Sequence, residues 1–369
     1  MTISDIAPLP SPPPRVQRYE TIVVGGGQAG LAVGHHLAAH DADFAILTDE
    51  ARVGDNWRRR WDSLRLFTPA TRSGLPGMPF PASPTHLPDK DEMADYLERY
   101  AERFDLPVRM GMRVTDLASI GGRYVLRCGD AAFEADSVVV ATGAFQQPRI
   151  PAAASRLSTD IRQLHSSEYT NPLALPDGPV LVVGAGNSGA QIALELARFR
   201  KVWLAGRPTG HLPRRVLGRD LFDWTWPIMS RATVDTRFGR RLRAKASGAG
   251  DPLVGIPEQE LVAAGVVRVG RLDDVRGGLP VCGSEVLEPR VIVWCTGFTP
   301  DYRWIRVPVF DADGYPRHRR GVVSEASGLY FLGLRFQHRP TSSLIGGVGA
   351  DAAWIAAQVA RRSEALASG

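Results

Sequence analysis

Two glycine-rich loops have the residue types and spacing from which a chemical task can be predicted. Gly25–Gly30 reads Gly-Gly-Gly-Gln-Ala-Gly and Gly184–Gly189 reads Gly-Ala-Gly-Asn-Ser-Gly, so both have the spacing G-x-G-x-x-G. The first glycine permits a tight turn, the second admits a pyrophosphate, and the third lets a helix pack closely. The N–H groups that begin this helix bind phosphate. Two nucleotide sites are predicted, at Gly25, Gly27, Gln28, Ala29 and Gly30 and at Gly184, Gly186, Asn187, Ser188 and Gly189.

The residues beyond each loop predict which nucleotide each site accepts. A carboxylate about 20 residues on usually binds the ribose hydroxyls, whereas an arginine there accommodates a 2′-phosphate. After the first loop the candidate is Asp49, with Glu50 behind it, and after the second it is Arg207. We therefore expect FAD at the first loop and NADPH rather than NADH at the second. Arg214 and Arg215 are further candidates for the 2′-phosphate, and solvated arginines are an equally good interpretation of them.

Apolar runs flank both loops in the order strand, helix, strand, which is the βαβ unit that such loops require. The first copy is predicted at 19–24, 31–39 and 44–47, and the second at 179–183, 191–199 and 202–205. Each copy is followed by an apolar strand, at 137–140 or 291–294, that ends in Thr-Gly. We expect the chain to cross between domains at Thr142, Gly143, Thr296 and Gly297, which are also candidate cofactor-binding residues.

This duplication predicts an α/β protein with two Rossmann-like dinucleotide-binding domains. An NADPH-binding domain is expected to be inserted in an FAD-binding domain, as in the glutathione-reductase-like two-domain fold. The expected boundaries are 1–18 for a disordered Pro-rich tail, 19–150 and 286–369 for the FAD-binding domain, and 151–285 for the NADPH-binding domain with its hinge. Residues 54–88 and 211–257 lack periodicity and are expected to be irregular. Asp89 and Glu92 have capping-box spacing, so a helix is expected to begin there.

Composition excludes several other classes of protein. The 369 residues are 44% hydrophobic and carry a formal charge of +5, with both signs interspersed, so we expect no nucleic-acid partner. The one dense basic cluster, at 237–245, could face an anionic cofactor or solvent. The three cysteines, Cys128, Cys282 and Cys295, form no C-x-x-C pair, which counts against a disulfide scaffold, a zinc site and thioredoxin-reductase chemistry. No secretory signal and no run of about 20 apolar residues is found, which favours a cytoplasmic protein without a membrane span.

Further motifs accompany the two loops in a characteristic order. They are Gly54-Asp55-Asn56-Trp57-Arg58, Thr142-Gly143, His165-Ser166-Ser167-Glu168-Tyr169 and Trp294-Cys295-Thr296-Gly297-Phe298. From about residue 19 to 360 the chain thereby resembles the class B flavin-dependent monooxygenases, especially their flavin-containing and YUCCA-type branch. The motifs together are specific for this superfamily and not for one substrate.

The resemblance implies an FAD- and NADPH-dependent oxidoreductase that acts on a small organic substrate and O₂. NADPH would reduce FAD, the reduced flavin would capture O₂ as a C4a-(hydro)peroxide, and one oxygen atom would pass to the substrate. Two alternatives stay open: a flavoprotein reductase or oxidase that inserts no oxygen, and a redox-sensing binding protein. The sequence identifies neither the substrate nor the oligomeric state, for which a homodimer is one option.

The resemblance also suggests roles for single residues. Asn56 and Gln337 are candidates for the amide that steadies the oxygenated flavin, and Trp57 is a candidate flavin contact. His165 is expected at the hinge, where organising the linker or NADP is favoured over proton transfer. Upstream of His165 the family signature has a Phe and a Gly that this chain lacks, which leaves the hinge geometry open.

Overall fold

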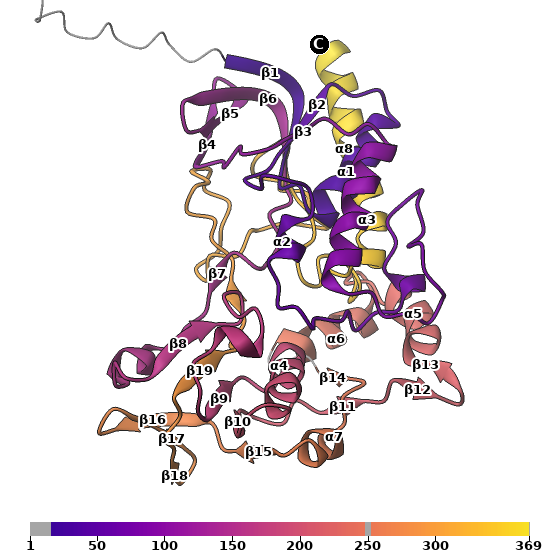
Figure 1. Cartoon of the computed structure of the whole chain (residues 1–369). Coiled ribbons are helices and arrows are strands. Elements are labelled where there is room, and N and C mark those ends of the chain that lie inside the picture. Colours follow the sequence, from indigo (N-terminus) through magenta and orange to yellow (C-terminus); the bar gives the residue numbers. More distant parts are fainter. Residues whose placement is uncertain (1–15, 248–251, 369) are drawn as a thin grey trace, which may run out of the picture.

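The computed structural model describes residues 16–247 and 252–368, which form two α/β units placed one above the other in Figure 1. A seven-stranded sheet forms the first unit and a five-stranded sheet the second, with smaller sheets beside them. The predicted α/β class and the two parallel dinucleotide-binding cores are therefore confirmed. Of the predicted tail, 1–15 lies outside the described residues, and 16–18 already belongs to the first strand.

The first unit is built on a sheet whose central strand leads into the first glycine loop. Strand β1 pairs in parallel with β2 on one side and with β6 on the other, so the loops after these three strands meet at one sheet edge. The antiparallel strands β4 and β5 extend the far edge. The strands are β1 (Val16–Val24), β2 (Phe44–Leu47), β3 (Val108–Arg109), β4 (Asp116–Ile120), β5 (Arg123–Cys128), β6 (Ala131–Val140) and β21 (Leu329–Phe331).

Three long helices lie together on one side of this sheet, where they bury its apolar face (Figure 1). They are α1 (Gln28–Ala38), α3 (Lys90–Arg103) and α8 (Gly349–Ser368). The predicted capping box begins α3, because the Asp89 carboxylate accepts from the Glu92 N–H and the Glu92 carboxylate accepts from the Asp89 N–H, each at 2.8 Å. The adjoining stretch 54–88 is largely irregular, as predicted, with only α2 (Asp55–Arg58) and a 3₁₀ turn at Ala70–Arg72.

The second unit is built on five parallel strands, with the second glycine loop after the middle one. Its order is β15 (Val266–Val269), β10 (Val202–Ala205), β9 (Val180–Val183), β19 (Val291–Trp294) and β8 (Arg162–His165). The helix α4 (Asn187–Ala197) follows β9, and α7 (Glu258–Ala263) precedes β15. A three-stranded antiparallel sheet extends from this unit and comprises β16 (Leu272–Arg276), β17 (Leu279–Cys282) and β18 (Glu285–Val286).

Two expectations about this region differ from the structure. The expected return to the first unit at residue 286 comes too early, because β19 pairs with β8 and β9 inside the second sheet. The stretch 211–257 is more regular than expected, since Asp220 caps a helix through its carboxylate, which accepts from the Phe222 N–H at 2.9 Å. Its elements are α5 (Leu221–Arg231), α6 (Arg237–Ser247) and the short strands β11 (His211–Leu212), β12 (Arg215–Val216), β13 (Arg219–Asp220) and β14 (Leu253–Val254).

Candidate active site

The first glycine loop has the close packing that its spacing predicts. Gly25 has φ +115°, and a Cβ on it would lie 2.5 Å from the carbonyl oxygen of Ala141. A Cβ on Gly30 would lie 1.8 Å from the carbonyl oxygen of Gly25. Only a glycine at this position therefore lets α1 pack so closely against the backbone of the loop. A Cβ on Gly27 would meet nothing within 4 Å. This opening lies at the start of α1, where unpaired N–H groups favour a phosphate.

The second loop repeats this arrangement almost without change. Gly184 has φ +112°, and a Cβ on it would lie 2.2 Å from the carbonyl oxygen of Cys295. A Cβ on Gly189 would again lie 1.8 Å from the first glycine's carbonyl oxygen, and one on Gly186 would meet nothing within 4 Å. Both loops thus close the first and third positions with backbone and leave the second open, as a bound pyrophosphate requires.

A cavity of about 360 Å³ opens at the first loop. It lies at the ends of β1, β2 and β6 and is bordered on another side by Gly333, Ser343 and Val348, which sequence analysis did not single out. Its lining includes the predicted residues Gly25, Gly27, Gln28, Ala29, Asp49, Asn56, Thr142 and Gly143.

Besides Gly30, which packs against the Gly25 carbonyl, two predicted residues of this site do not line the cavity. The ring of Trp57 packs instead against the hydrophobic core cluster, which contains residues of both units. Gln337 is 1% exposed, and its side-chain oxygen accepts from the Leu334 N–H at 3.2 Å, which fixes a turn after β21. Asn56 lines the cavity through α2, and its side-chain oxygen accepts from Arg60 at 3.2 Å. Of the two amides proposed to steady the flavin, only Asn56 therefore reaches the cavity.

Two carboxylates at the end of β2 differ in their surroundings. Asp49 is half exposed and accepts from the Arg113 guanidinium at 2.8 Å. Glu50 is buried, and one of its oxygens accepts from the Asn56 N–H at 2.8 Å while the other has no hydrogen-bond partner among the described residues. Burial raises the pKa of Glu50 above its usual range. An unpaired oxygen here suits a ribose hydroxyl, so Glu50 is better placed for that contact than Asp49.

His165 lies fully buried at the end of β8 and fixes the crossing between the two units. Its Nε2 lies 3.0 Å from the Gly297 carbonyl oxygen, and its Nδ1 lies 3.2 Å from the Ser167 N–H. A carbonyl only accepts and a backbone N–H only donates, so the imidazole is neutral with its proton on Nε2. Burial lowers the pKa of His165, which favours the same form. Because both nitrogens have structural partners, linker organisation is the role that this geometry supports.

Two linkers join the units and pair with each other in antiparallel fashion. They contain β7 (Gln147–Pro148) and β20 (Phe298–Thr299). The Thr296 hydroxyl donates to the Arg149 carbonyl oxygen, and the Arg149 N–H donates to the Gly297 carbonyl oxygen at 3.0 Å. The second Thr-Gly pair therefore lies at the crossing between units, as predicted.

Gln146 joins the same linkers through its side chain, although sequence analysis did not identify it. Its amide nitrogen donates to the Thr142 hydroxyl at 2.9 Å and to the Gly143 carbonyl oxygen at 2.7 Å. Its amide oxygen accepts from the Asp301 N–H at 2.7 Å. One glutamine therefore couples the strand end at the cavity to the returning chain.

Arg60 is a second residue that sequence analysis missed. Its guanidinium lies over the rings of Phe145 and Phe298, at 5.2 and 5.5 Å from their centres, so it contacts one aromatic ring from each linker. The two rings meet edge to face at 5.2 Å. The signal that could have found this cluster is the phenylalanine that follows each Thr-Gly pair closely.

The second loop is surrounded by arginines with different tasks. Arg207 is exposed, directly after Gly206, so its charge is available to a nucleotide phosphate. Arg268, which was not predicted, donates to the carbonyl oxygens of Leu204 and Gly206 at 3.3 and 3.2 Å and so fixes the end of β10. Ser188 is the second residue of α4, close to the open Gly186.

Two other side chains at this loop make internal contacts instead. The Asn187 amide bonds to the backbone of Pro252 at 3.1 Å and of Val254 at 3.0 Å, which leaves its own backbone N–H for a phosphate. Arg214 bonds to the Phe67 carbonyl oxygen and to the Asp220 carboxylate, both at 2.6 Å. Arg214 therefore connects the two units and is not the free 2′-phosphate ligand that the sequence suggested.

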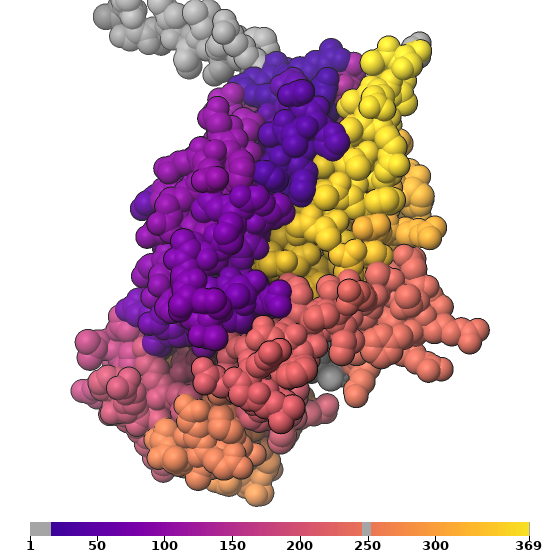
Figure 2. All heavy atoms as spheres, turned by 90° about the vertical axis from the view of Figure 1, so that its right-hand side faces the viewer, coloured from indigo at the N-terminus to yellow at the C-terminus, as the bar shows by residue number. Residues whose placement is uncertain are grey.

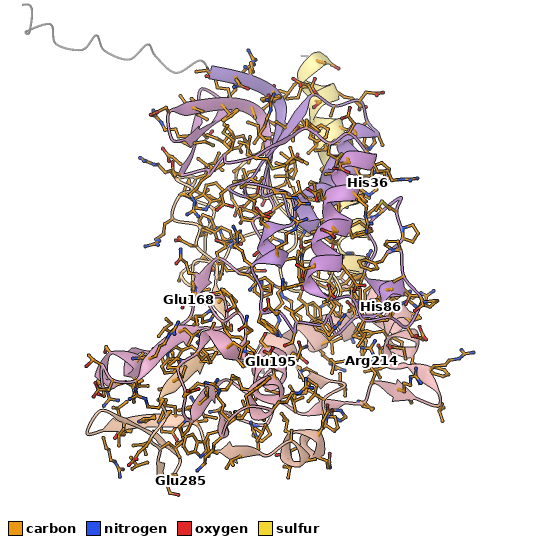
Figure 3. All side chains as sticks on the ribbon, viewed as in Figure 1. His36, His86, Glu168, Glu195, Arg214 and Glu285 are labelled. Carbon is orange, nitrogen blue, oxygen red and sulfur yellow. The ribbon has the colours of Figure 1, made fainter. Side chains whose placement is uncertain are left out.

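The two units contact each other through polar groups near the second loop. The Gln191 side chain pairs with the backbone of Arg65 at 3.2 and 3.0 Å, in the manner of a strand. The Asp62 N–H donates to the Thr170 carbonyl oxygen at 2.8 Å. Glu195 and Arg214 lie at the boundary between the two units in Figure 3. These contacts hold the two nucleotide sites in a defined relative position.

Two nucleotide cradles of matching geometry, joined by paired linkers, define a pyridine-nucleotide-dependent flavoprotein. The family model described as "Pyridine nucleotide-disulphide oxidoreductase" matches residues 22–211. The chain belongs to this family and, within it, to the class B flavin-dependent monooxygenases, whose cofactors are FAD and NADPH.

Relatives support this membership over nearly the whole chain. An uncharacterised CzcO-like oxidoreductase of Geobacillus kaustophilus is 42% identical over 91% of this chain and 97% of its own length. Indole-3-pyruvate monooxygenase YUCCA4 of Oryza sativa is 29% identical over 92% of this chain and 87% of its own length. A mutant flavin monooxygenase from Stenotrophomonas maltophilia has 26% identity and a TM-score of 0.78, covering 94% of this chain and all of that one. The predicted resemblance is confirmed.

Proposed function

We propose that the protein is an NADPH-dependent flavin monooxygenase that oxygenates a small organic substrate. The observation that carries the proposal is the pair of glycine cradles, one followed by a buried carboxylate and the other by an exposed arginine. The residues at the first cradle fit FAD, because Gly27 leaves space for a pyrophosphate and Glu50 has an unpaired oxygen for a ribose hydroxyl. When bound, FAD reduced by NADPH supplies the activation of O₂.

The chain's own residues bind and orient the two nucleotides. Glu50 would hold the FAD ribose, Asn56 would offer its amide in the cavity, and Arg207 would hold the 2′-phosphate of NADPH. His165 and Gln146 position the linkers, so that the second nucleotide approaches the first in a fixed orientation. Arg60 contacts one phenylalanine of each linker and so helps to hold the two linkers together.

The domain organisation belongs to the same proposal. The chain would leave an FAD-binding domain at β7, form the NADPH-binding domain, and return at β20, which makes the second domain an insertion in the first. The three cysteines are free, and their thiols are expected to stay reduced, so we place the protein in the cytoplasm. Among residues 16–247 and 252–368, no helix has both the length and the apolar composition needed to cross a membrane.

The cysteines do not favour disulfide reduction, despite the family's name. Cys128 and Cys282 are buried, and no cysteine forms a disulfide. Burial raises the pKa of Cys128 and Cys282 to about 11 and that of Cys295 to about 12. Thiols with such pKa values supply almost no thiolate near neutral pH, and the thiolate is the form that attacks disulfides.

The test is the fate of O₂. Purified, FAD-loaded protein should lose flavin absorbance when NADPH is added without oxygen. After oxygen is admitted with a panel of amines, sulfides, indoles and keto acids, at least one product should contain ¹⁸O from ¹⁸O₂. Stoichiometric H₂O₂ with every substrate would favour the reductase or oxidase alternative. Flavin that NADPH never bleaches would favour the redox-sensing alternative, and protein that binds no flavin would end the proposal.

A further inference from the structure

The positive charge of the chain is concentrated in one segment. Residues 211–247 contain nine arginines and lysines and three aspartates, a formal charge of +6, against +5 for all 369 residues. The rest of the chain is therefore close to neutral, and the interspersed charge expected from composition describes only that part. Figure 2 shows this segment, in salmon, as a ledge that projects below the yellow C-terminal part.

The formal charge of +6 already counts the three acids of this segment, and each of these acids has a partner. Asp220 pairs with Arg214 at 2.6 Å, Asp223 pairs with Arg72 from the first unit at 3.8 Å, and Asp235 lies 3.2 Å from His338. The arginines and lysine of α6 meet no acid on their own helix. The segment therefore presents an excess of cations to solvent, which favours an anionic partner.

An apolar strip lies among these cations. Leu217 is 87% exposed, Trp224 is 44% exposed and Ile228 is 60% exposed. Trp224 and Ile228 are four residues apart on α5 and so share one face of it. The Trp224 indole N–H donates to the Val216 carbonyl oxygen at 3.1 Å, which places the β12–β13 turn against that face. We call Leu217, Trp224 and Ile228 the apolar strip.

The turn residue Leu217 is unexpected on local grounds. It and Gly218 form the two-residue connection between β12 and β13, and both have positive φ, at +51° and +76°. Such turns strongly favour Asn or Asp at the first position, because these residues tolerate the left-handed conformation. A leucine there gains nothing from the turn and buries no surface within the chain. Its exposed side chain is better explained by a partner.

We propose that the apolar strip and its surrounding arginines dock the protein on the surface of an anionic lipid bilayer. Leucine, isoleucine and tryptophan side chains insert at the boundary between headgroups and acyl chains, while arginines bind the lipid phosphates. Arg215, Arg219 and Arg231 are exposed around the strip. This mode of attachment needs no spanning helix. The proposal does not depend on the proposed enzymatic reaction.

Two other occupants fit the surface less well. A second copy of the chain would bring one segment of charge +6 near another in a symmetric dimer, and like charges would repel. A nucleic acid would match the arginines, but exposed leucine and isoleucine add little to phosphate or groove binding. Of these three partners, only an anionic bilayer offers phosphates for the arginines and an apolar region for the exposed leucine, isoleucine and tryptophan.

The test is co-sedimentation of the FAD-loaded protein with lipid vesicles. Vesicles of phosphatidylcholine with about one third phosphatidylglycerol should bind the protein, vesicles of phosphatidylcholine alone should bind much less, and salt should weaken binding. The double variant L217E and I228E should lose at least about tenfold in binding. Arg219→Gln and Arg231→Gln should each cost roughly fivefold in vesicle binding.

Leu173→Glu is the matched control, because Leu173 is 86% exposed and lies outside the segment. Its vesicle binding should match that of the unaltered protein, and flavin reduction by NADPH should be unchanged in every variant. Equal binding to neutral vesicles, or equal loss in Leu173→Glu, would overturn the proposal. It would also be overturned if duplex DNA displaced the protein from vesicles, or if L217E and I228E converted a dimer that ignores vesicles into a monomer.

Discussion

The two glycine loops are nearly identical cradles placed in different surroundings. Their central glycines have φ of −81° and −82°, and their third glycines leave the same 1.8 Å between a Cβ and the first glycine's carbonyl oxygen. The two sites differ in the residues that follow the next strand of each unit. Asp49 and Glu50 follow β2, whereas Arg207 follows β10. The backbone geometry of the two loops therefore matches, and the side chains that would distinguish the two nucleotides lie elsewhere.

The largest effects are expected where the cradles are closed. Gly30→Ala and Gly189→Ala both force a Cβ against a backbone carbonyl, which should cost about 3 kcal/mol or more locally. Gly30→Ala should give colourless protein. Gly189→Ala should keep its FAD but lose at least about 100-fold in the rate of flavin reduction by NADPH, a change of about 2.7 kcal/mol. Flavin content and stopped-flow absorbance measure both, with dithionite reduction of the flavin as the control. Normal reduction by NADPH in Gly189→Ala would contradict the assignment of the second site.

The open positions separate nucleotide binding from folding. Gly27→Ala and Gly186→Ala place a methyl group in empty space with ordinary φ, so the melting temperature should barely change. The methyl group would occupy the volume that a pyrophosphate needs, so affinity should fall about tenfold or more, or ~1.4 kcal/mol. Gly27→Ala should weaken the binding of FAD, and Gly186→Ala should raise the KM for NADPH. A fall in melting temperature of the flavin-free variants would show that these positions also serve packing.

Arg207 tests the choice between the two reduced nicotinamide nucleotides. Arg207→Ala should raise the KM for NADPH about tenfold, because a charge-assisted bond to phosphate is lost, and leave that for NADH unchanged. Arg198→Ala is the matched control, since Arg198 is also exposed and ends α4. If Arg207→Ala changed the KM values for NADPH and NADH by the same factor, the assignment of Arg207 to the 2′-phosphate would be wrong.

The smallest effects should distinguish the two carboxylates of the first site. The pKa of Glu50 is higher in the folded flavin-free protein than in the unfolded chain, where it is about 4.3. Ionising Glu50 therefore lowers the free energy of unfolding as pH rises through the folded-state pKa, and this loss is absent below a pH of about 4.3. Glu50→Gln should therefore stabilise the flavin-free protein by about 1 kcal/mol near pH 7 while weakening FAD several-fold. Asp49→Asn should change stability by less than about 0.5 kcal/mol, because its ion pair is exposed. Thermal melts from pH 4 to 8, with and without FAD, measure the stability and the FAD binding of both variants. If Asp49→Asn weakened FAD binding more than Glu50→Gln did, Asp49 would again be the preferred ribose ligand.

Much of the fold could be predicted because its central strands are buried on both faces. The strands at 44–47, 202–205 and 291–294 were predicted at their observed bounds, since each is an uninterrupted apolar run. The helices after the glycine loops begin three or four residues earlier than predicted, at Gln28 and Asn187, because polar and glycine residues of a first turn carry no apolar periodicity. α5 and α6 escaped prediction because Pro227 and closely spaced arginines obscure their pattern.

The site was predictable where one short stretch of sequence forms it. Both glycine loops and both Thr-Gly pairs belong to this class. Arg60 and Gln146 do not, because only the fold brings Arg60 to the phenylalanines of the linkers and Gln146 to Asp301. The preference for Asp49 over Glu50 likewise depended on burial, which spacing does not reveal.

The pairing of the two linkers restricts how the halves of the molecule can move. Two unpaired linkers would let one unit rotate relative to the other. β7 and β20 are instead hydrogen-bonded to each other and form a narrow two-stranded ribbon. Twisting a ribbon shears its hydrogen bonds, whereas bending it across its flat face leaves them intact. Any opening between the two units should therefore be a bend in one direction, after which the second glycine loop returns to the same position relative to the first.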